Sequence, residues 1–394
     1  MIPRDVEKMI HEQLRGFPVV TITGPRQSGK TTLARAVFSQ NPYLSLEDPD
    51  VRQLAHDDPR AFLGRLSEGA VLDEVQRAPD LLSYLQTHVD SLGRMGVFLL
   101  TGSQNFGLMS GITQSLAGRT SFIELLPFSI SELDRGCVRP SDLDTMLFSG
   151  GYPPLYDRDL TPGAWFSAYV TAYVERDVRQ ILKVQDLDTF QRFIRLCAGR
   201  SGQLLNLSSL ANDCGVTHNT AKAWISTLEA SYILFLLRPH HMNFNKRLVK
   251  TPKLYFYDTG LLCWLLGIQN ADQLASHPLR GSIFETFVVS ELMKTRFNRL
   301  QNTAFYFWRD SNGNEIDLIV DCGGRLMPVE IKAGQTLNRD FFSGIERWLA
   351  LAGEQAFAPA LVYGGAETTN RKGIRVFGWR MTGELLGELS ANRS

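Results

Sequence analysis

Eight residues near the start of the chain have the types and spacing of a loop that binds phosphate groups. Residues 24–31 read Gly-Pro-Arg-Gln-Ser-Gly-Lys-Thr, which fits the pattern G-x-x-x-x-G-K-[ST]. The apolar residues 19–22 precede the loop as a predicted strand, and residues 32–38 follow it as a predicted helix. A strand, a glycine loop and a helix in this order aim backbone N–H groups and the positive helix end at one point. A chance glycine loop is the alternative, and the flanking elements argue against it.

Two side chains of this loop have distinct expected roles. Lys30 is expected to reach the β- and γ-phosphates of ATP, and the Thr31 hydroxyl to ligate Mg²⁺. The residues expected to contact ATP are Gly24, Pro25, Arg26, Gln27, Ser28, Gly29, Lys30, Thr31 and Thr32.

A pair of acidic residues ends the next predicted strand. Residues 70–72 are apolar, and Asp73 and Glu74 follow them. If both strands lie in one parallel sheet, these acids lie beside the phosphate loop. We expect Asp73 to hold Mg²⁺, directly or through water, and Glu74 to polarise the water that attacks ATP. The alternative is a solvated acidic turn.

Polar residues follow a third predicted strand, residues 96–100. Ser103 is the first choice to orient the attacking water, and Asn105 is the second. Further on, Arg119 is a candidate to neutralise γ-phosphate charge, in its own subunit or a neighbour's. A plain surface salt bridge is the alternative for Arg119.

The order of these features resembles the AAA+ ATPases, and most of all a prokaryotic AAA family. Members of that family carry Thr-Gly-Ser and Ala-Gly-Arg after the third strand, as residues 101–103 and 117–119 do here. Residues 125–129, 150–153 and 173–177 also look like that family, and the second half resembles its domain of unknown function 4143. The resemblance covers nearly the whole chain. It implies an ATPase whose relatives often form rings, which makes a homo-oligomer one possibility and leaves the oligomeric state open.

The middle of the chain has the pattern of a helix-turn-helix followed by a basic hairpin. Thr217 is expected to cap the second helix, with Ala221, Trp224 and Ile225 on its inner face. Residues 238–253 then contain no acidic residue and five basic ones: Arg238, Lys246, Arg247, Lys250 and Lys253. This pattern predicts a winged helix that binds DNA phosphates. A winged helix used only for packing is the alternative.

Carboxylates and a lysine near the C-terminus have the spacing of a nuclease site. Glu330 and Lys332 are two apart in a predicted strand and point to one face, and Asp317 lies in the neighbouring antiparallel strand. Asp317 and Glu330 are expected to share one or two Mg²⁺ ions, Lys332 to orient a water, and Glu285 to add a ligand. The arrangement resembles the PD-(D/E)xK core of restriction-endonuclease-like enzymes, although Ile316 precedes Asp317 where that pattern has proline. Solvated charges, or a core of this type that does not cleave, are the alternatives.

The composition of the chain limits the class of protein and its surroundings. The chain has 394 residues with 41 basic and 41 acidic side chains, so net charge argues neither for nor against DNA binding. Five scattered cysteines without a C-x-x-C pair, and no apolar run long enough to span a membrane, fit a cytoplasmic protein.

The expected fold class is α/β, in three domains. Residues 1–160 form a P-loop, AAA+-like parallel-sheet ATPase domain, residues 161–270 a helical and winged-helix domain, and residues 271–394 an α/β restriction-endonuclease-like domain. The predicted function is a Mg²⁺-dependent ATPase that acts on DNA, with a metal-dependent nuclease site. The rival is a non-catalytic, ATP-dependent switch, whereas a small-molecule kinase leaves the second half unexplained.

Overall fold

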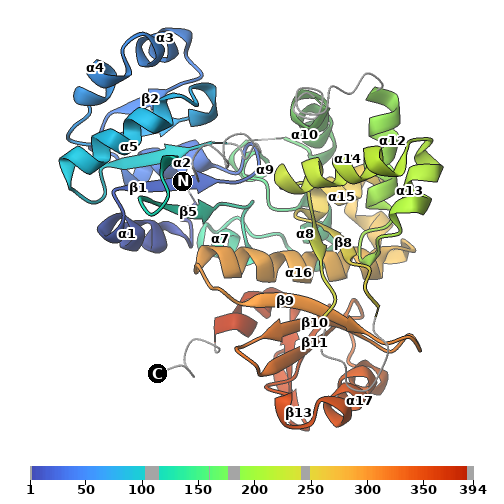
Figure 1. Ribbon diagram of the computed structural model, residues 1–394. Helices are drawn as coiled ribbons and strands as arrows, with labels where there is room; N and C mark the ends of the chain where they lie inside the picture. Colours follow the sequence, from blue (N-terminus) through green and yellow to red (C-terminus); the bar gives the residue numbers. More distant parts are fainter. Residues whose placement is uncertain (1, 103–114, 159, 176–186, 241–248, 388–394) are drawn as a thin grey trace. The chain divides into compact units, whose positions relative to one another are not determined.

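The computed structural model describes residues 2–102, 115–158, 160–175, 187–240 and 249–387 (Figure 1). The chain divides into two compact units. The first comprises Met1–Phe128, Ala230–Tyr232 and Phe297–Gln301, and the second comprises Ser129–Glu229, Ile233–Arg296 and Asn302–Ser394. Within the described ranges, no helix is both long and apolar enough to cross a membrane.

A parallel sheet is the framework of the first unit. Its strands within the described residues are β1 (Val19–Thr23), β2 (Tyr43–Ser45), β3 (Ala70–Asp73), β4 (Phe98–Thr101) and β5 (Thr120–Glu124). Their order is β2-β3-β4-β1-β5, and every neighbouring pair is parallel. Strand β4 therefore lies between the strand that leads into the phosphate loop and the strand that ends in Asp73.

Helices cover both faces of this sheet. They are α1 (Glu7–Gly16), α2 (Lys30–Val37), α3 (Pro49–Asp57), α4 (Pro59–Gly64) and α5 (Leu81–Leu92). Val20 and Ile22 of β1 are in one core with residues of α1 and α2, whereas Leu72 of β3 is in another with residues of α4 and α5. Because neighbouring strand residues face opposite sides, strands that are apolar throughout fill both cores. The prediction of a parallel α/β sheet in this half is confirmed.

The second unit begins with short helices. Three further helices, α12 (Leu187–Ala198), α13 (Leu207–Cys214) and α14 (His218–Ala230), are interspersed along the chain with the strands of a small antiparallel sheet. The other helices are α7 (Ile130–Arg135), α8 (Leu143–Ser149), α9 (Pro154–Asp157), α10 (Pro162–Tyr169) and α15 (Thr259–Leu265). Among the described residues, β6 (Gln203–Leu204), β7 (Leu234–Leu237) and β8 (Lys253–Phe256) pair in the order β6-β8-β7. Thr217 caps α14 as predicted, since its Oγ1 accepts from the Thr220 N–H at 3.1 Å.

A mixed sheet closes the second unit. Helix α16 (Arg280–Asn298) precedes the antiparallel strands β9 (Ala304–Arg309), β10 (Glu315–Asp321) and β11 (Leu326–Lys332). Helix α17 (Ser343–Ala352) then leads to β12 (Ala360–Tyr363), which is parallel to β11, and β13 (Thr369–Arg371) and β14 (Ile374–Gly378) complete the sheet. The two strands predicted to carry Asp317 and Glu330 are therefore neighbours, β10 and β11, and β9 pairs with the other edge of β10.

The glycine pair at residues 150–151 has a structural role in this unit. Gly150 has φ +69°, and a Cβ added there would lie 2.3 Å from the buried Asp258 carboxylate. That carboxylate accepts from the Gly151 N–H at 2.7 Å and from the Leu261 N–H at 2.9 Å, so it ties the turn to the start of α15. Only glycine fits at position 150.

Candidate functional site

The phosphate loop lies between β1 and α2, and its backbone needs glycine at both ends. Gly24 has φ +146°, and a Cβ there would meet the Leu125 carbonyl oxygen at 2.2 Å. Gly29 has φ +92° and directly precedes the first residue of α2. Any other residue would strain the loop at these positions, so the local sequence determines a loop that opens onto a helix N-terminus.

Lys30 lies buried within this loop. Its Nζ donates to the carbonyl oxygens of Gly24 at 3.1 Å and Pro25 at 2.7 Å. The ammonium group is thus held over the loop, from where it can donate to phosphate oxygens bound by the loop's N–H groups.

Asp73 is the centre of a hydroxyl cluster at the carboxyl ends of the strands. Three hydroxyl groups of the described chain donate to its carboxylate. Thr31 Oγ1 lies 3.0 Å and Tyr43 Oη 2.6 Å from Oδ2, and Thr101 Oγ1 donates to Oδ1. A threonine hydroxyl beside a buried carboxylate is a donor set that suits Mg²⁺. Thr31 and Asp73 would hold the ion, which supplies charge neutralisation for the phosphates when bound.

Tyr43 and Thr101 are site residues that the sequence analysis missed. Burial, followed by the hydrogen bond to Asp73, raises the pKa of the Tyr43 phenol well above its ordinary value, so the hydroxyl keeps its proton and donates. Thr101 is the last residue of β4 and the first polar one after its apolar run, a signal that was present in the sequence. Ser103 and Asn105, the predicted water-orienting residues, lie outside the described part of the chain.

Glu74 adopts a left-handed backbone conformation with φ +56° directly after β3. Its carboxylate Oε2 accepts a hydrogen bond from the Gln76 side-chain amide. A non-glycine residue in this region is uncommon and strained. The turn therefore holds the predicted base in one particular direction at the end of the strand that carries Asp73.

Arg4 is a further missed residue at this site. Its guanidinium donates to the Ser28 carbonyl of the phosphate loop at 3.0 Å and to the Leu126 carbonyl at 2.6 Å, and it lies 4.6 Å from the centroid of the Phe128 ring. Arg4 is only 7% exposed. It fixes the loop backbone from a position 24 residues away, which no local sequence pattern signals.

Arg119 forms a bidentate pair with Asp90 of α5, at 2.6 Å from Nε to Oδ1 and 2.8 Å from Nη2 to Oδ2. The hydrogen bond raises the pKa of Arg119 and lowers that of Asp90. Both side chains are partly exposed. This is the surface salt bridge weighed as the alternative, and a role at the γ-phosphate stays a prediction.

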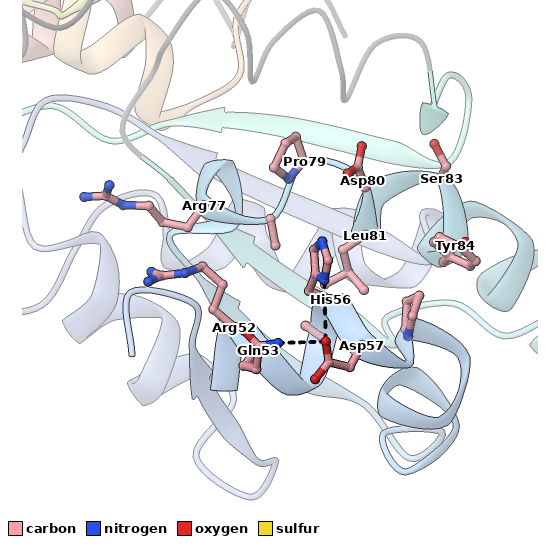
Figure 2. Close-up of a pocket in the computed structure, with 13 residues that line it drawn as sticks. Arg52, Gln53, His56, Asp57, Arg77, Pro79, Asp80, Leu81, Ser83 and Tyr84 are labelled. Atoms are coloured by element: carbon pink, nitrogen blue, oxygen red, sulfur yellow. Dashed lines mark hydrogen bonds and ion pairs between the residues drawn. The ribbon is translucent and has the colours of Figure 1, made fainter. Parts of the chain in front are cut away.

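A surface hollow of about 760 Å³ also lies in the first unit, between α3 and residues 77–84 (Figure 2). Arg52, His56 and Asp57 line one side, and Arg77 and Tyr84 the other. Its lining includes neither the phosphate loop nor Asp73. It is therefore separate from the nucleotide site.

A second polar cluster lies in the mixed sheet of the second unit. Lys332 Nζ lies 2.6 Å from Glu330 Oε1 and 3.8 Å from Asp317 Oδ2. Asp317 Oδ2 also accepts from the Ile331 N–H at 2.8 Å, which fixes its carboxylate against β11. The three residues predicted to form a nuclease site thus converge in space.

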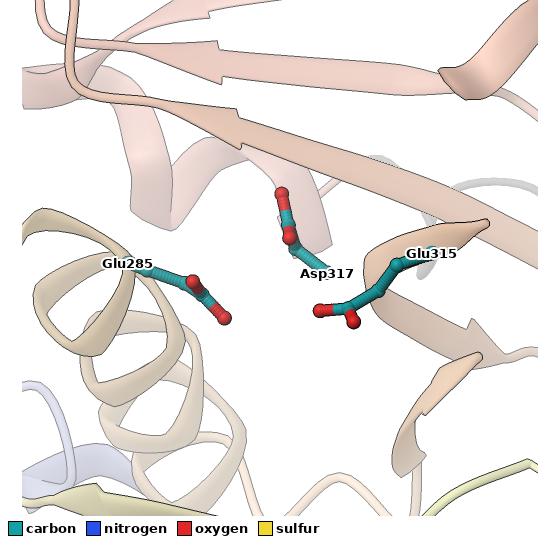
Figure 3. A group of neighbouring side chains, drawn as sticks. All are labelled: Glu285, Glu315 and Asp317. Carbon is teal, nitrogen blue, oxygen red and sulfur yellow. The ribbon is translucent and has the colours of Figure 1, made fainter. Parts of the chain in front are cut away.

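Glu285 of α16 also reaches this cluster, but with a partner that the sequence analysis missed. Carboxylate oxygens of Glu285, Glu315 and Asp317 all lie within 4.8 Å of one another, a grouping able to hold a metal ion (Figure 3). Glu315 is the first residue of β10 and shares its strand face with Asp317. Because residues two apart in a strand point to the same face, the spacing of Glu315 and Asp317 could have identified Glu315 from the sequence.

Two residues of β8 complete the cluster. The Lys253 ammonium lies 2.8 Å from Glu285 Oε1 and also pairs with Glu315, and the Tyr255 hydroxyl donates to Glu285 at 2.5 Å. Lys253 is 2% exposed. Its expected place among the phosphate-binding residues of a basic hairpin is therefore wrong, because a buried ammonium cannot contact DNA.

The excess of carboxylates perturbs the ionisation of the cluster. Burial, followed by the charge of Asp317, raises the pKa of both Glu285 and Glu330 to about 7. Burial alone lowers the pKa of Lys253, but the charges of the surrounding carboxylates outweigh it and the pKa lies above its ordinary value. For Lys332 too, burial alone lowers the pKa, but the charges of Asp317 and Glu330 outweigh it and the pKa is raised.

Comparisons with known proteins agree with the first site. The family model "AAA domain" matches residues 16–134, and "Domain of unknown function (DUF8612)" and "Domain of unknown function (DUF4143)" match residues 140–272 and 280–381. Uncharacterized protein Rv2008c of Mycobacterium tuberculosis is 34% identical over 369 residues, which are 92% of this chain and 80% of that protein. Uncharacterized protein Mb2031c of Mycobacterium bovis gives the same values.

The chain belongs to this family of AAA-type ATPases with a DUF4143 domain. The AAA match covers the loop, Asp73 and Glu74, so the prediction of an ATP-binding ATPase domain is confirmed.

Solved structures also include proteins similar to this AAA-type ATPase. The Walker-type ATPase PABY2304 of Pyrococcus abyssi has a TM-score of 0.43 at 16% identity and covers 67% of this chain and 96% of its own. The AMPPCP-bound DnaA from Aquifex aeolicus has a TM-score of 0.31 at 14% identity and covers 56% of this chain and 86% of its own.

Proposed function

We propose that this AAA-type ATPase uses ATP to act on DNA, and that its DUF4143 domain cleaves phosphodiester bonds with Mg²⁺. The proposed cleavage rests on the convergence of Asp317, Glu330 and Lys332 on adjacent strands. The Lys332 ammonium lies 2.6 Å from Glu330 and 3.8 Å from Asp317. Two carboxylates and one ammonium on one sheet face suit a phosphate, a metal ion and a water.

The order of elements around this cluster supports a restriction-endonuclease-like fold. A long helix, three antiparallel strands, a helix and a parallel strand follow one another as α16, β9, β10, β11, α17 and β12. Such a core presents its carboxylates from the central strands and leaves the neighbouring helix to add one more, which here is Glu285.

Residues of the chain have separable roles in the proposed cleavage. Asp317 and Glu330 would hold Mg²⁺, and Glu330 Oε2 suits this role because it is buried and has no hydrogen-bond partner among the described residues. Mg²⁺ supplies charge neutralisation at the phosphate when bound. Lys332 donates to the carboxylate at its side and orients a water toward the phosphate.

In the ATPase domain, we assign the hydrolytic roles to four residues. Lys30 donates to the phosphates, Thr31 and Asp73 would hold Mg²⁺, and Glu74 accepts a proton from the attacking water. The αL turn at Glu74 and the hydroxyl cluster around Asp73 support this division of roles.

Residues 187–256 support a winged helix that contacts DNA. Helix α12, strand β6, helices α13 and α14, and strands β7 and β8 occur in the order of that fold. The exposed side chains of Arg238 and Lys250 flank the basic segment between β7 and β8. Phosphate contacts of this kind predict DNA affinity that falls steeply with salt.

The cleavage assay compares wild type with Lys332→Ala on labelled duplex and single-stranded DNA, with ATP and either Mg²⁺ or Mn²⁺. We expect cleavage by wild type and its loss in Lys332→Ala. The matched control is Lys372→Ala, since Lys372 lies in the turn between β13 and β14, is 79% exposed and pairs only loosely with Glu346 at 4.0 Å. Equal cleavage by wild type and Lys332→Ala would refute the assignment of this site.

One observation favours a second candidate, the non-catalytic ATP-dependent switch. Among the described residues, Lys253, Lys332 and Arg309 already pair with the carboxylates of the cluster. Cationic partners of this kind stabilise a carboxylate group without a metal. Under this alternative, no DNA is cut with either ion, and ATP changes only the affinity for DNA or the assembly state.

A further inference from the structure

The carboxylate cluster offers two positions for a cation, and they differ in what lies there. One is bounded by Glu285 and Glu315, and the Lys253 ammonium lies against both. The other is bounded by Asp317 and Glu330, where Glu330 Oε2 is buried without a hydrogen-bond partner in the described chain. Asp317 lies between the two positions, since its carboxylate groups with Glu285 and Glu315 and also contacts Lys332.

Lys253 cannot easily leave its position. It is the first residue of β8, the central strand of the small sheet, and pairs with Leu204 on one side and Leu237 on the other. Its side chain is 3% exposed, and the ammonium lies 5.6 Å from the centroid of the buried Phe307 ring. A buried ammonium without its carboxylates is strongly unfavourable, so the lysine and its two partners form a fixed unit.

A divalent ion and this ammonium exclude each other. Both need the carboxylates of Glu285 and Glu315, which the Lys253 ammonium already contacts. Two cations in contact within a buried cluster repel strongly. The position between Asp317 and Glu330 favours a divalent ion instead, because a cation there would pair with the buried Glu330 oxygen that has no hydrogen-bond donor in the described chain.

We infer that Lys253 is a built-in cation that fills the Glu285–Glu315 position, so that this cluster takes one divalent ion, at Asp317 and Glu330, and not two. The single-ion part rests on the proposed metal-dependent function, whereas the role of Lys253 does not. Lys253 is therefore a positioning residue. It holds Glu285 and Glu315 in place of a second metal, and it does so from the strand that follows the basic segment of the proposed winged helix.

The test counts bound Mn²⁺ by electron paramagnetic resonance, on full-length protein without nucleotide. Asp317→Asn, which alters both positions, defines the background from other sites. We expect wild type to bind one Mn²⁺ above this background and Lys253→Met to bind two. Lys253→Arg keeps a cation at the position and is expected to bind one.

Lys294→Met is the matched control for loss of a buried lysine. Lys294 is also almost fully buried and lies 2.6 Å from a glutamate of its own helix, Glu291. Both methionine variants are expected to lose thermal stability, but Mn²⁺ raises the melting temperature by a larger shift in Lys253→Met only, because binding to the folded state alone stabilises it.

Each outcome is decisive. Two ions in wild type, or no gain in Lys253→Met, would overturn the inference. If Lys253→Met does not fold, the wild-type count still decides between one ion and two. No ion in wild type with one in Lys253→Met would support the role of Lys253 while refuting the proposed metal site, so the two failures are distinguishable.

Discussion

Replacing Tyr43 with phenylalanine tests whether the hydroxyl cluster around Asp73 contributes to ATP hydrolysis. The substitution removes one atom, the hydroxyl that donates to Asp73 Oδ2 at 2.6 Å, and keeps the ring that packs 4.8 Å from the Arg35 guanidinium. Thr31 and Thr101 continue to donate to the same carboxylate. The expected effect is therefore a partial loss of orientation.

The magnitude follows from the type of bond. A hydrogen bond to a charged group contributes about 1.5–3 kcal/mol when it is buried. Tyr43 is only partly buried, so we take the lower end. Since 1.4 kcal/mol corresponds to a factor of ten, kcat/KM for ATP is expected to fall roughly tenfold.

The assay measures ATP turnover at a series of Mg²⁺ concentrations. Tyr43→Phe is expected to need more Mg²⁺ for half-maximal turnover, because the carboxylate that would hold the ion is less well fixed. Tyr84→Phe is the matched control, since Tyr84 is 39% exposed on α5 and its hydroxyl is not part of the cluster. Turnover of Tyr43→Phe within twofold of wild type, or an equal loss in both variants, would refute the reasoning.

Three further predictions concern other parts of the structure. Gly150→Ala is expected to lower the free energy of unfolding in a denaturant titration by at least about 2 kcal/mol more than Gly267→Ala. Both have positive φ, but a Cβ at Gly150 meets a buried carboxylate oxygen at 2.3 Å and one at Gly267 meets nothing within 4 Å. The pKa of Glu330 is raised from 4.5 to about 7 by burial and neighbouring carboxylates, so its contribution to stability is fully present below pH 4.5 and is lost as the pH rises through 7. Unfolding of wild type should therefore become easier from pH 5 to 8, and Glu330→Gln should flatten this slope; an unchanged slope would contradict it. If Arg119 acts at the γ-phosphate, Arg119→Ala lowers ATP turnover by about 10³-fold or more, whereas Asp90→Ala, which removes its partner, leaves turnover intact; equal turnover in both would leave only the surface salt bridge.

The sequence predicted the parts of the fold that local patterns determine. The apolar strand before Gly24, the helix that follows the loop and the acidic end of β3 were all found, because each is read from consecutive residues. The three strands around Asp317 were likewise found from alternation and an Asn-Gly turn.

Residues brought to the sites from distant segments were not predictable in the same way. Arg4 and Tyr43 reach the ATPase site from the N-terminal segment and from the edge strand β2, and nothing local marks them as polar partners of Ser28 or Asp73. Strand order decides these contacts, and it is a property of the whole sheet.

Lys253 shows the same limit more sharply. In the sequence it is one of five basic residues in an acid-free stretch, which predicts a surface that binds phosphates. The structure buries it against Glu285 and Glu315 instead. Composition indicates charge, but only the packing of β8 against the later helix and strands shows which charge is neutralised internally.

We propose that the nucleotide state of the ATPase domain controls action on DNA. The most direct test of this control is the affinity for labelled duplex DNA, measured by fluorescence anisotropy with ADP and with ATP plus Mg²⁺, for wild type and Lys30→Ala. We expect the two nucleotides to give affinities that differ several-fold in wild type, and the difference to vanish in Lys30→Ala. Equal affinity in both nucleotide states of wild type, or no DNA binding at low salt, would contradict the claim.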